Sequence, residues 1–149
     1  MPKRNLLDEK DKKIIKILRE DCLTPFVKIA KILGVNEGTV RHRVKRLLKK
    51  GIIKQFTITT DPTKLGLNTL AFVFVNIRNT NVEDIVKKLT RIPNILEIHE
   101  IHTDGDFLLK IRASDPKEIA NIISDNIKAY NISDTRVVYV LNTWKEDIC

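Results

Sequence analysis

The pattern of apolar and polar residues after position 70 occurs twice, and this repeat limits the possible folds more than any other feature. In the first copy, residues 70–78 are apolar on both faces, which is typical of a buried strand. Asn81 then caps a helix, and residues 95–103 form a second strand. The apolar stripe of that helix consists of Val82, Ile85, Val86 and Leu89.

The second copy follows the same order. Residues 107–112 predict a strand, Asp115–Pro116 with Glu118 predicts a capping box that opens a helix, and residues 135–144 predict the last strand. A doubled β-α-β unit gives a ferredoxin-like β-α-β-β-α-β sandwich, an α+β fold in which helices cover one face of an antiparallel sheet. The residues expected to point inward from the second helix are Ile119, Ile122, Ile123 and Ile127.

The second face of this sheet has no covering segment in the sequence. It would carry Phe72, Phe74 and either Val138 or Val140, depending on the register of the last strand. Because an apolar sheet face of this kind is rarely left in water, we expect the chain to form a homodimer through the sheet.

Apolar residues recur at helical spacing near the N-terminus and predict three helices. Asp8 is expected to cap the first, Thr24 with Pro25 to open the second, and Asn36 to open the third after a glycine turn. A tight turn between two helices, the second of them basic, is the helix-turn-helix arrangement, with or without a wing. The residues expected to face inward are Leu7, Ile14, Ile15, Ile17 and Leu18, then Phe26, Val27, Ile29, Ala30 and Leu33, and finally Val40, Val44, Leu47 and Leu48.

A β-rich segment connects the two parts. Residues 52–60, IIKQFTITT, alternate and are rich in β-branched side chains, so they predict a strand. The expected organisation is therefore a helix-turn-helix domain over residues 1–51, a strand and linker over 52–66, and a ferredoxin-like regulatory and oligomerisation domain over 67–149.

The charge of the chain changes sign at the same region. Residues 1–60 hold 16 Lys or Arg against 6 Asp or Glu, a net charge of +10, whereas residues 61–149 hold 11 against 13, a net charge of −2. A break of this size indicates that the N-terminal part meets a polyanion and the C-terminal part does not. Together with the helix-turn-helix pattern, it predicts that the N-terminal part binds double-stranded DNA.

The third helix supplies the candidate DNA contacts on its exposed face. Residues near a recognition-helix N-terminus normally reach base edges, and later basic residues reach phosphates. Gly38, which allows close approach of the backbone to DNA, and Arg43, which flanks the buried stripe, are also candidate DNA-binding residues. The candidate base readers are Asn36, Glu37, Thr39, Arg41 and His42, and the candidate phosphate contacts are Lys45, Arg46, Lys49 and Lys50.

Three segments together resemble the Lrp/AsnC family of leucine-responsive or feast/famine transcription regulators. They are LLDEKDKKIIKILRED, IAKILGVNEGTVRHRVKRLLKKGIIKQF and TDPTKLG, and the β-α-β-β-α-β region is similar to the regulatory domain of that family. The resemblance covers essentially the whole chain. It implies a dimer, or dimers that assemble into a tetramer or an octamer. The assembly binds DNA through paired recognition helices and responds to small effectors, often amino acids, at interfaces between C-terminal domains.

The family's effector loop corresponds to four residues of this chain. The family typically has a glycine two or three residues before an aspartate, whereas Gly105 here directly precedes Asp106. A plain turn between two strands accounts for these residues equally well. The candidate effector-binding residues are Thr103, Asp104, Gly105 and Asp106.

Two other functions are compatible with parts of the pattern. Some proteins that resemble this family decarboxylate haem precursors, and His99 and His102 are the C-terminal histidines available for such tetrapyrrole chemistry; the basic third helix argues against this enzyme. RNA binding would require stacking aromatics on the third sheet strand, where only Phe107 is present. No catalytic constellation or phosphate loop is evident, so we expect a protein that is not an enzyme and needs no cofactor.

The remaining features exclude further classes. The longest apolar run, residues 70–75, is far shorter than the roughly 18 residues that a membrane span requires, and no signal peptide is evident, which predicts a cytoplasmic protein with no membrane partner. Two cysteines do not form a disulfide framework. Glu97 and His99 face one side of a strand, and Glu100 and His102 the other, so no metal site is expected.

Overall fold

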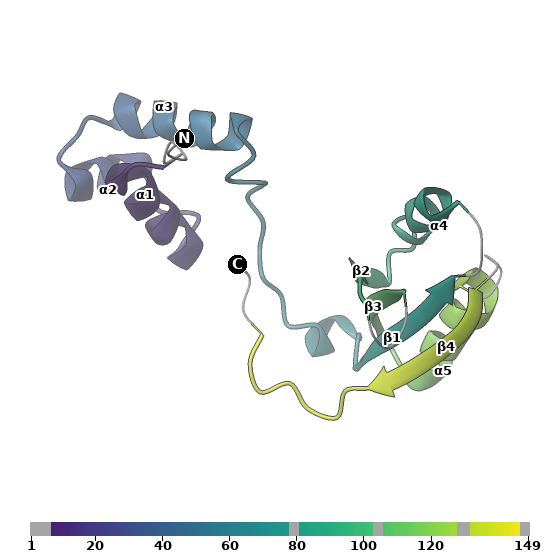
Figure 1. Ribbon diagram of the computed structural model, residues 1–149. Coiled ribbons are helices and arrows are strands. Elements are labelled where there is room, and N and C mark those ends of the chain that lie inside the picture. Colours follow the sequence, from purple (N-terminus) through teal and green to yellow (C-terminus); the bar gives the residue numbers. More distant parts are fainter. Residues whose placement is uncertain (1–6, 78–80, 103–105, 128–131, 147–149) are drawn as a thin grey trace. The chain divides into compact units, whose positions relative to one another are not determined.

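The computed structural model describes residues 7–77, 81–102, 106–127 and 132–146 (Figure 1). Contacts between Cα atoms divide the chain into two compact units, Met1–Thr59 and Thr60–Cys149. The first unit is helical and the second holds the sheet, so each has its own hydrophobic core.

The N-terminal unit contains α1 (Glu9–Glu20), α2 (Phe26–Leu33) and α3 (Glu37–Lys49), as expected. Asp8 and Asp11 form a reciprocal capping box at the start of α1. Gly34 has a φ of 62°, a left-handed conformation that glycine adopts without strain, and it makes the turn between α2 and α3. The three helices pack around fully buried side chains, among them Ile14, Ile29, Val40 and Leu47.

Two expectations for α2 are wrong. Thr24 does not cap the helix: its hydroxyl donates to the Asp21 carboxylate at 3.2 Å, and the carbonyl of Pro25 accepts the first helical hydrogen bonds. Val27 does not point inward and is 50% exposed. The inward stripe of α2 has the spacing i, i+3, i+4, i+7, from which Val27 is rotated by about 100°. That stripe consists of Phe26, Ile29, Ala30 and Leu33.

The predicted strand over residues 52–60 is absent from the described chain. Ile52 and Ile53 instead form a turn against the end of α3, where their N–H groups donate to the carbonyl of Leu47 at 3.0 and 3.3 Å. Gly51, with a φ of 68°, allows this turn, and residues 54–60 are exposed. A strand requires a neighbour to complete its hydrogen bonds, and these residues pair with no strand in the described part of the chain.

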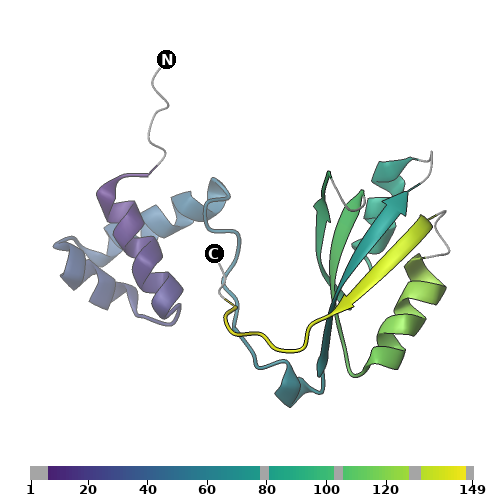
Figure 2. The ribbon, with the colours of Figure 1, turned by 60° about the horizontal axis from the view of Figure 1, so that its bottom comes forward.

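The C-terminal unit has the predicted β-α-β-β-α-β order (Figure 2). A short 3-10 turn, η1 (Thr63–Leu65), precedes the sheet, and a π-helical turn, η2 (Ile123–Ile127), extends the second sheet-covering helix. The sheet order is β2-β3-β1-β4 with antiparallel neighbours, which confirms the ferredoxin-like sandwich. The elements are β1 (Thr69–Ile77), α4 (Val82–Leu89), β2 (Ile95–Glu100), β3 (Phe107–Ala113), α5 (Pro116–Ile122) and β4 (Ile132–Tyr139).

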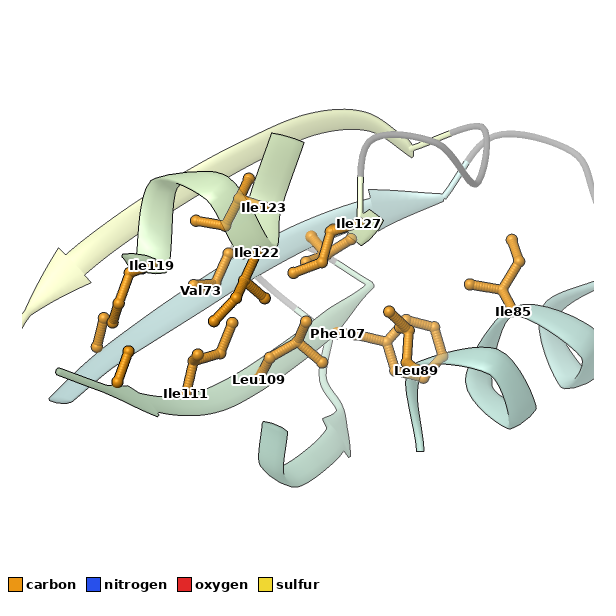
Figure 3. Packing of buried hydrophobic residues seen from close by; sticks show 13 residues of the cluster. Val73, Ile85, Leu89, Phe107, Leu109, Ile111, Ile119, Ile122, Ile123 and Ile127 are labelled. Atoms are coloured by element: carbon orange, nitrogen blue, oxygen red, sulfur yellow. The ribbon is translucent and has the colours of Figure 1, made fainter. Parts of the chain in front are cut away.

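One face of the sheet packs against both helices. Alternate residues of β1 and β3 are buried there, including Val73, Leu109 and Ile111, and Figure 3 shows them beneath the isoleucines of α5 and η2. On the opposite face Phe72 pairs with Val138 across β1 and β4. Val138 is 45% exposed on this face, and Val140, two residues later, lies beyond the end of β4. The predicted apolar residues therefore lie on the open face, together with charged side chains such as Lys110 and Arg136, whose guanidinium lies 4.3 Å from the centre of the Phe74 ring.

Three details of this unit differ from the expectations. β2 ends at Glu100 and β4 at Tyr139, so both strands are shorter than predicted at their C-terminal ends. At α5, Asp115 accepts from the Glu118 N–H at 2.9 Å, as a cap should. The Glu118 carboxylate, however, accepts from the N–H and hydroxyl of Ser114, one residue before the cap, because that hydroxyl offers a second hydrogen bond.

Candidate nucleic-acid interface

Helix α3 presents one buried face and one basic exposed face. Its 13 residues make it about 20 Å long, and Val40, Val44 and Leu47 hold it against the other two helices. An α-helix of this length fits the major groove of B-DNA. The exposed polar positions and glycine are Asn36, Gly38, Arg41, His42, Lys45, Lys49 and Lys50, whereas Glu37, Thr39, Arg43 and Arg46 are half-buried. The expectation that Leu48 faces inward is wrong, because this side chain is 37% exposed.

The N-terminal end of α3 is fixed by its cap. The Asn36 side-chain oxygen accepts from the Thr39 N–H at 2.7 Å and from the Thr39 hydroxyl at 2.9 Å. A Cβ atom at Gly38 would lie 3.3 Å from the same oxygen, which is a tight contact. A larger residue here would require the Asn36 oxygen to shift by a few tenths of an ångström, so Gly38 leaves room for the cap. The sequence alone did not reveal this contact. The cap fixes the part of α3 that would enter a groove first.

Arg41 lies along the helix in this structure. Its guanidinium contacts the Glu37 carboxylate at 2.5 Å and lies 5.6 Å from the centre of the Phe26 ring. The Arg41 and Glu37 side chains are 56% and 43% exposed, and an i, i+4 pair this accessible to water contributes only about 0.3–0.5 kcal/mol. Arg41 can therefore leave Glu37 for a stronger bidentate partner such as a guanine edge.

Arg43 and Arg46 have acidic partners on α1. Arg43 Nη1 lies 2.6 Å from Asp8 and 2.9 Å from Asp11, and Arg46 Nη2 lies 2.5 Å from Asp11. Only 1% of the Asp11 side chain is exposed. The hydrogen bond from Arg43 holds the pKa of Asp8 below its usual value, and Asp8 raises the pKa of Arg43 in return. We call these four residues the α1–α3 ion-pair cluster.

The role of Asp11 was not predicted from the sequence, although a signal for it was present. Leu7, Asp11, Ile14 and Leu18 follow one another at spacings of four, three and four residues, which is a single helix face. A carboxylate in the middle of an apolar stripe requires a buried partner. That rule predicts a basic residue on a neighbouring helix opposite Asp11.

Three lysines lie on α3 and at its C-cap. Lys45, Lys49 and Lys50 are exposed, and within the described ranges none of them forms an ion pair. Their ammonium groups extend from the helix into solvent without a compensating carboxylate. This arrangement suits transient contacts with phosphates.

Most of the predicted effector loop lies outside the described residues, namely Thr103, Asp104 and Gly105. Asp106 is described, and its carboxylate accepts from the Ile77 N–H at 2.5 Å while its own N–H donates to the Val75 carbonyl at 2.9 Å. Asp106 thus connects the end of this loop to the end of β1. Such backbone bonds suit either a plain turn or the rim of a ligand site.

His99, one of the two histidines considered for tetrapyrrole chemistry, forms ordinary contacts on the sheet. His99 contacts Glu97 at 3.0 Å on the open face of the sheet, and Lys110 contacts the same carboxylate at 3.2 Å. Hydrogen bonds from His99 and Lys110 lower the pKa of Glu97. The described ranges contain no group of three or more His, Cys, Asp or Glu arranged to hold a metal, and no helix within them is long and apolar enough to cross a membrane.

Comparisons with known proteins match both units. Residues 7–54 match the family model for winged helix-turn-helix DNA-binding domains, and residues 70–148 match that for the Lrp/AsnC ligand binding domain. The chain is 36% identical over 143 residues to the HTH-type transcriptional regulator FL11 of Pyrococcus furiosus, covering 96% of this chain and 95% of that protein. It is 39% identical over 122 residues to the regulator LrpA of Pyrococcus abyssi, covering 82% and 86%.

Solved structures show the same fold. Escherichia coli AsnC superposes with a TM-score of 0.89 at 20% identity, over 97% of this chain and 98% of that one. A transcriptional regulator of Neisseria meningitidis in complex with L-Met superposes with a TM-score of 0.86 at 24% identity, over 95% and 94%. Both matches extend over the helical unit and the sheet unit.

Proposed function

The chain belongs to the Lrp/AsnC family of transcriptional regulators, and we propose that its α3 helix reads specific double-stranded DNA sites in response to an amino acid. The observation that supports this most directly is the exposed face of α3, with its capped N-terminal end and its lysines without acidic partners. We place this function in the cytoplasm, with no catalytic role.

The residues of α3 divide into three roles under this proposal. Lys45, Lys49 and Lys50 contact phosphates because they are exposed and uncompensated. Arg43 and Arg46 hold α3 to α1 through Asp11, and Gly38 keeps the cap intact. The side chains assigned to base edges are Asn36, Glu37, Thr39, Arg41 and His42.

The open sheet face supports a homodimer as the functional form. A second copy that covers Phe72, Phe74 and Val138 would remove this apolar surface from water and would relate two α3 helices by a two-fold axis. We propose that such dimers associate further into tetramers or octamers. A two-fold axis matches a DNA site made of two inverted halves.

An amino acid is the proposed effector. The regulator of Neisseria meningitidis that shares this fold was crystallised as an L-Met complex. We propose that the loop formed by Thr103, Asp104, Gly105 and Asp106 contributes to effector binding between C-terminal units. The tetrapyrrole decarboxylase alternative has less support, since the relatives of this chain are described as transcriptional regulators.

Four single substitutions test the roles on α3. Lys45→Ala and Lys49→Ala are expected to weaken specific and scrambled DNA alike and to lower the salt slope by about 1, because each phosphate contact releases roughly one counterion. Thr39→Ala and His42→Ala should instead relax preference at particular base positions, with a loss of about 1–3 kcal/mol on the preferred site.

The measurement is fluorescence anisotropy with both DNAs across a salt series. Lys87→Ala is the matched control, because Lys87 is an exposed lysine on α4 in the other unit and should leave all affinities unchanged. Equal losses on specific and scrambled DNA for Thr39→Ala and His42→Ala would overturn the assignment of the reading end.

A further inference from the structure

The arginines of α3 differ from its lysines in their charge partners. Arg41 contacts a glutamate of its own helix, and Arg43 and Arg46 contact the two aspartates of the α1–α3 ion-pair cluster. The three lysines form no ion pair within the part of the chain that the structure describes. The cluster holds two carboxylates and two guanidinium groups, so its net charge is zero. Its two arginines therefore add no net positive charge to this edge of α3.

The Asp8 carboxylate uses its two oxygens for two different contacts. Oδ1 accepts from the Asp11 N–H at 2.8 Å and caps α1, whereas Oδ2 accepts from Arg43 Nη1 at 2.6 Å. The same Nη1 also donates to Asp11 Oδ1 at 2.9 Å, so both of its hydrogens have an acceptor. The Asp8 side chain is 51% exposed and that of Asp11 only 1%. The contact between Arg43 and Asp8 is thus the one on the solvent side of the cluster.

A DNA phosphate at this edge of α3 would compete with Asp8 for Arg43. Carboxylates and phosphates are both oxyanions, and a guanidinium group binds either of them through the same N–H groups. Arg43 is 20% exposed and lies two residues before Lys45, a candidate phosphate contact. The hydrogen bond from Arg43 holds the pKa of Asp8 below its usual value, so Asp8 is ionised at neutral pH. Its negative charge offsets the attraction between Arg43 and a phosphate.

We propose that Asp8 limits sequence-independent DNA binding by holding Arg43 away from phosphates. Asp8 acts through Arg43 and is therefore a positioning residue. A regulator meets far more non-specific DNA than target sites, so a weaker affinity for every sequence leaves more protein free for its own sites. This inference rests on the proposed DNA binding by α3 and names a residue that adjusts its strength.

The substitution Asp8→Asn tests the contact while keeping the cap. Asparagine is as good an N-cap as aspartate, and its amide nitrogen does not accept a hydrogen bond from Arg43. We expect the affinity of the full chain for scrambled DNA to rise about 5–10-fold at about 0.1 M salt, because Arg43 gains a phosphate contact that releases roughly one counterion. The salt slope should steepen by about 1 for each chain in the complex. Loss of a merely structural contact would instead weaken DNA binding.

Three further variants control for charge, for Arg43 and for the cap. Glu20→Gln removes the same charge at an exposed position in the last turn of α1, and should change the affinity less than about twofold because screening weakens distant charges. The double variant Asp8→Asn, Arg43→Gln restores a neutral cluster and should return to within about twofold of the native affinity. Asp8→Ser keeps a cap and should reproduce the gain, so the test remains valid if Asp8→Asn does not fold.

Fluorescence anisotropy with scrambled DNA across a salt series measures these affinities, and circular dichroism checks that each variant is folded. An unchanged or weaker affinity in a folded Asp8→Asn variant would overturn the inference. A gain that persists in the double variant would also overturn it, because the effect would then not pass through Arg43.

Selected DNA sites separate this inference from the proposed function. If Asp8→Asn gains affinity for scrambled DNA but the native chain prefers no sequence, the restraint by Asp8 stands and the proposed reading of specific sites fails. If the native chain prefers a selected site and Asp8→Asn gains nothing on scrambled DNA, the proposed function stands and this inference fails. Absence of DNA binding by both chains would overturn both.

Discussion

A chain that lacks residues 1–59 is expected to lose DNA binding, by more than about 1,000-fold in affinity, and to remain a folded, self-associating protein. The deleted unit holds α3, and the N-terminal sixty residues carry the net charge of +10. The remaining residues have their own core between one sheet face and two helices, and their net charge is −2.

Light scattering and fluorescence anisotropy measure the two halves of this prediction. The truncated chain should scatter as a dimer or larger, because the open face with Phe72, Phe74 and Val138 is still present. The isolated fragment 1–59 is the complementary control and should keep weak, salt-sensitive binding to any DNA sequence. A folded but monomeric truncated chain would contradict assembly through the sheet.

Replacement of Asp11 by alanine is expected to destabilise the N-terminal unit by about 3–5 kcal/mol, the usual cost of removing one partner from a buried ion pair. The change leaves Arg43 and Arg46 beside each other without the carboxylate that both of them contact. It also removes the N3 side chain of the α1 capping box. Since a small domain has little stability to lose, much of this unit should unfold near room temperature.

Urea unfolding followed by circular dichroism checks this prediction, with Asp8→Ala as the matched control. Asp8 belongs to the same cluster but is half exposed, so its removal should cost much less. Equal losses for the two variants would show that burial of Asp11 contributes nothing. Acid should also destabilise this unit, because the pKa of Asp8 is lower in the folded state than in the unfolded state. The stabilisation by the Asp8 carboxylate is present at pH values above its unfolded-state pKa and is lost as the pH falls through its folded-state pKa.

The sequence predicted the elements whose signals are local. Helical spacing and capping residues placed α1 and α3, including the caps Asp8 and Asn36, and the repeated strand and helix pattern predicted the sandwich. Strand ends depend on the neighbouring strand and were less predictable. β4 ends after Tyr139 because its ladder runs out near Leu70, where β1 begins. Residues 52–60 have high β-propensity but no neighbour in the described chain.

At the candidate DNA-binding site, too, local features were predicted from the sequence and contacts between helices were not. Helical geometry identified which residues of α3 face away from the core, but it does not show which of them meet an acidic partner from another helix. Arg43 and Arg46 are predicted DNA contacts, and helical spacing did not reveal that both also contact Asp11, 32 and 35 positions earlier in the chain.

Selection of bound DNA from a random pool tests the central claim most directly, that paired α3 helices of a two-fold symmetric assembly read sequence. The native chain should enrich pseudo-palindromic sites whose half-sites lie about 10–10.5 base pairs, or a multiple of this, apart. His42→Ala, carried through the same selection, should lose preference at the same position in both halves. Enriched sites without two-fold symmetry, or a pool that remains unenriched, would contradict the account.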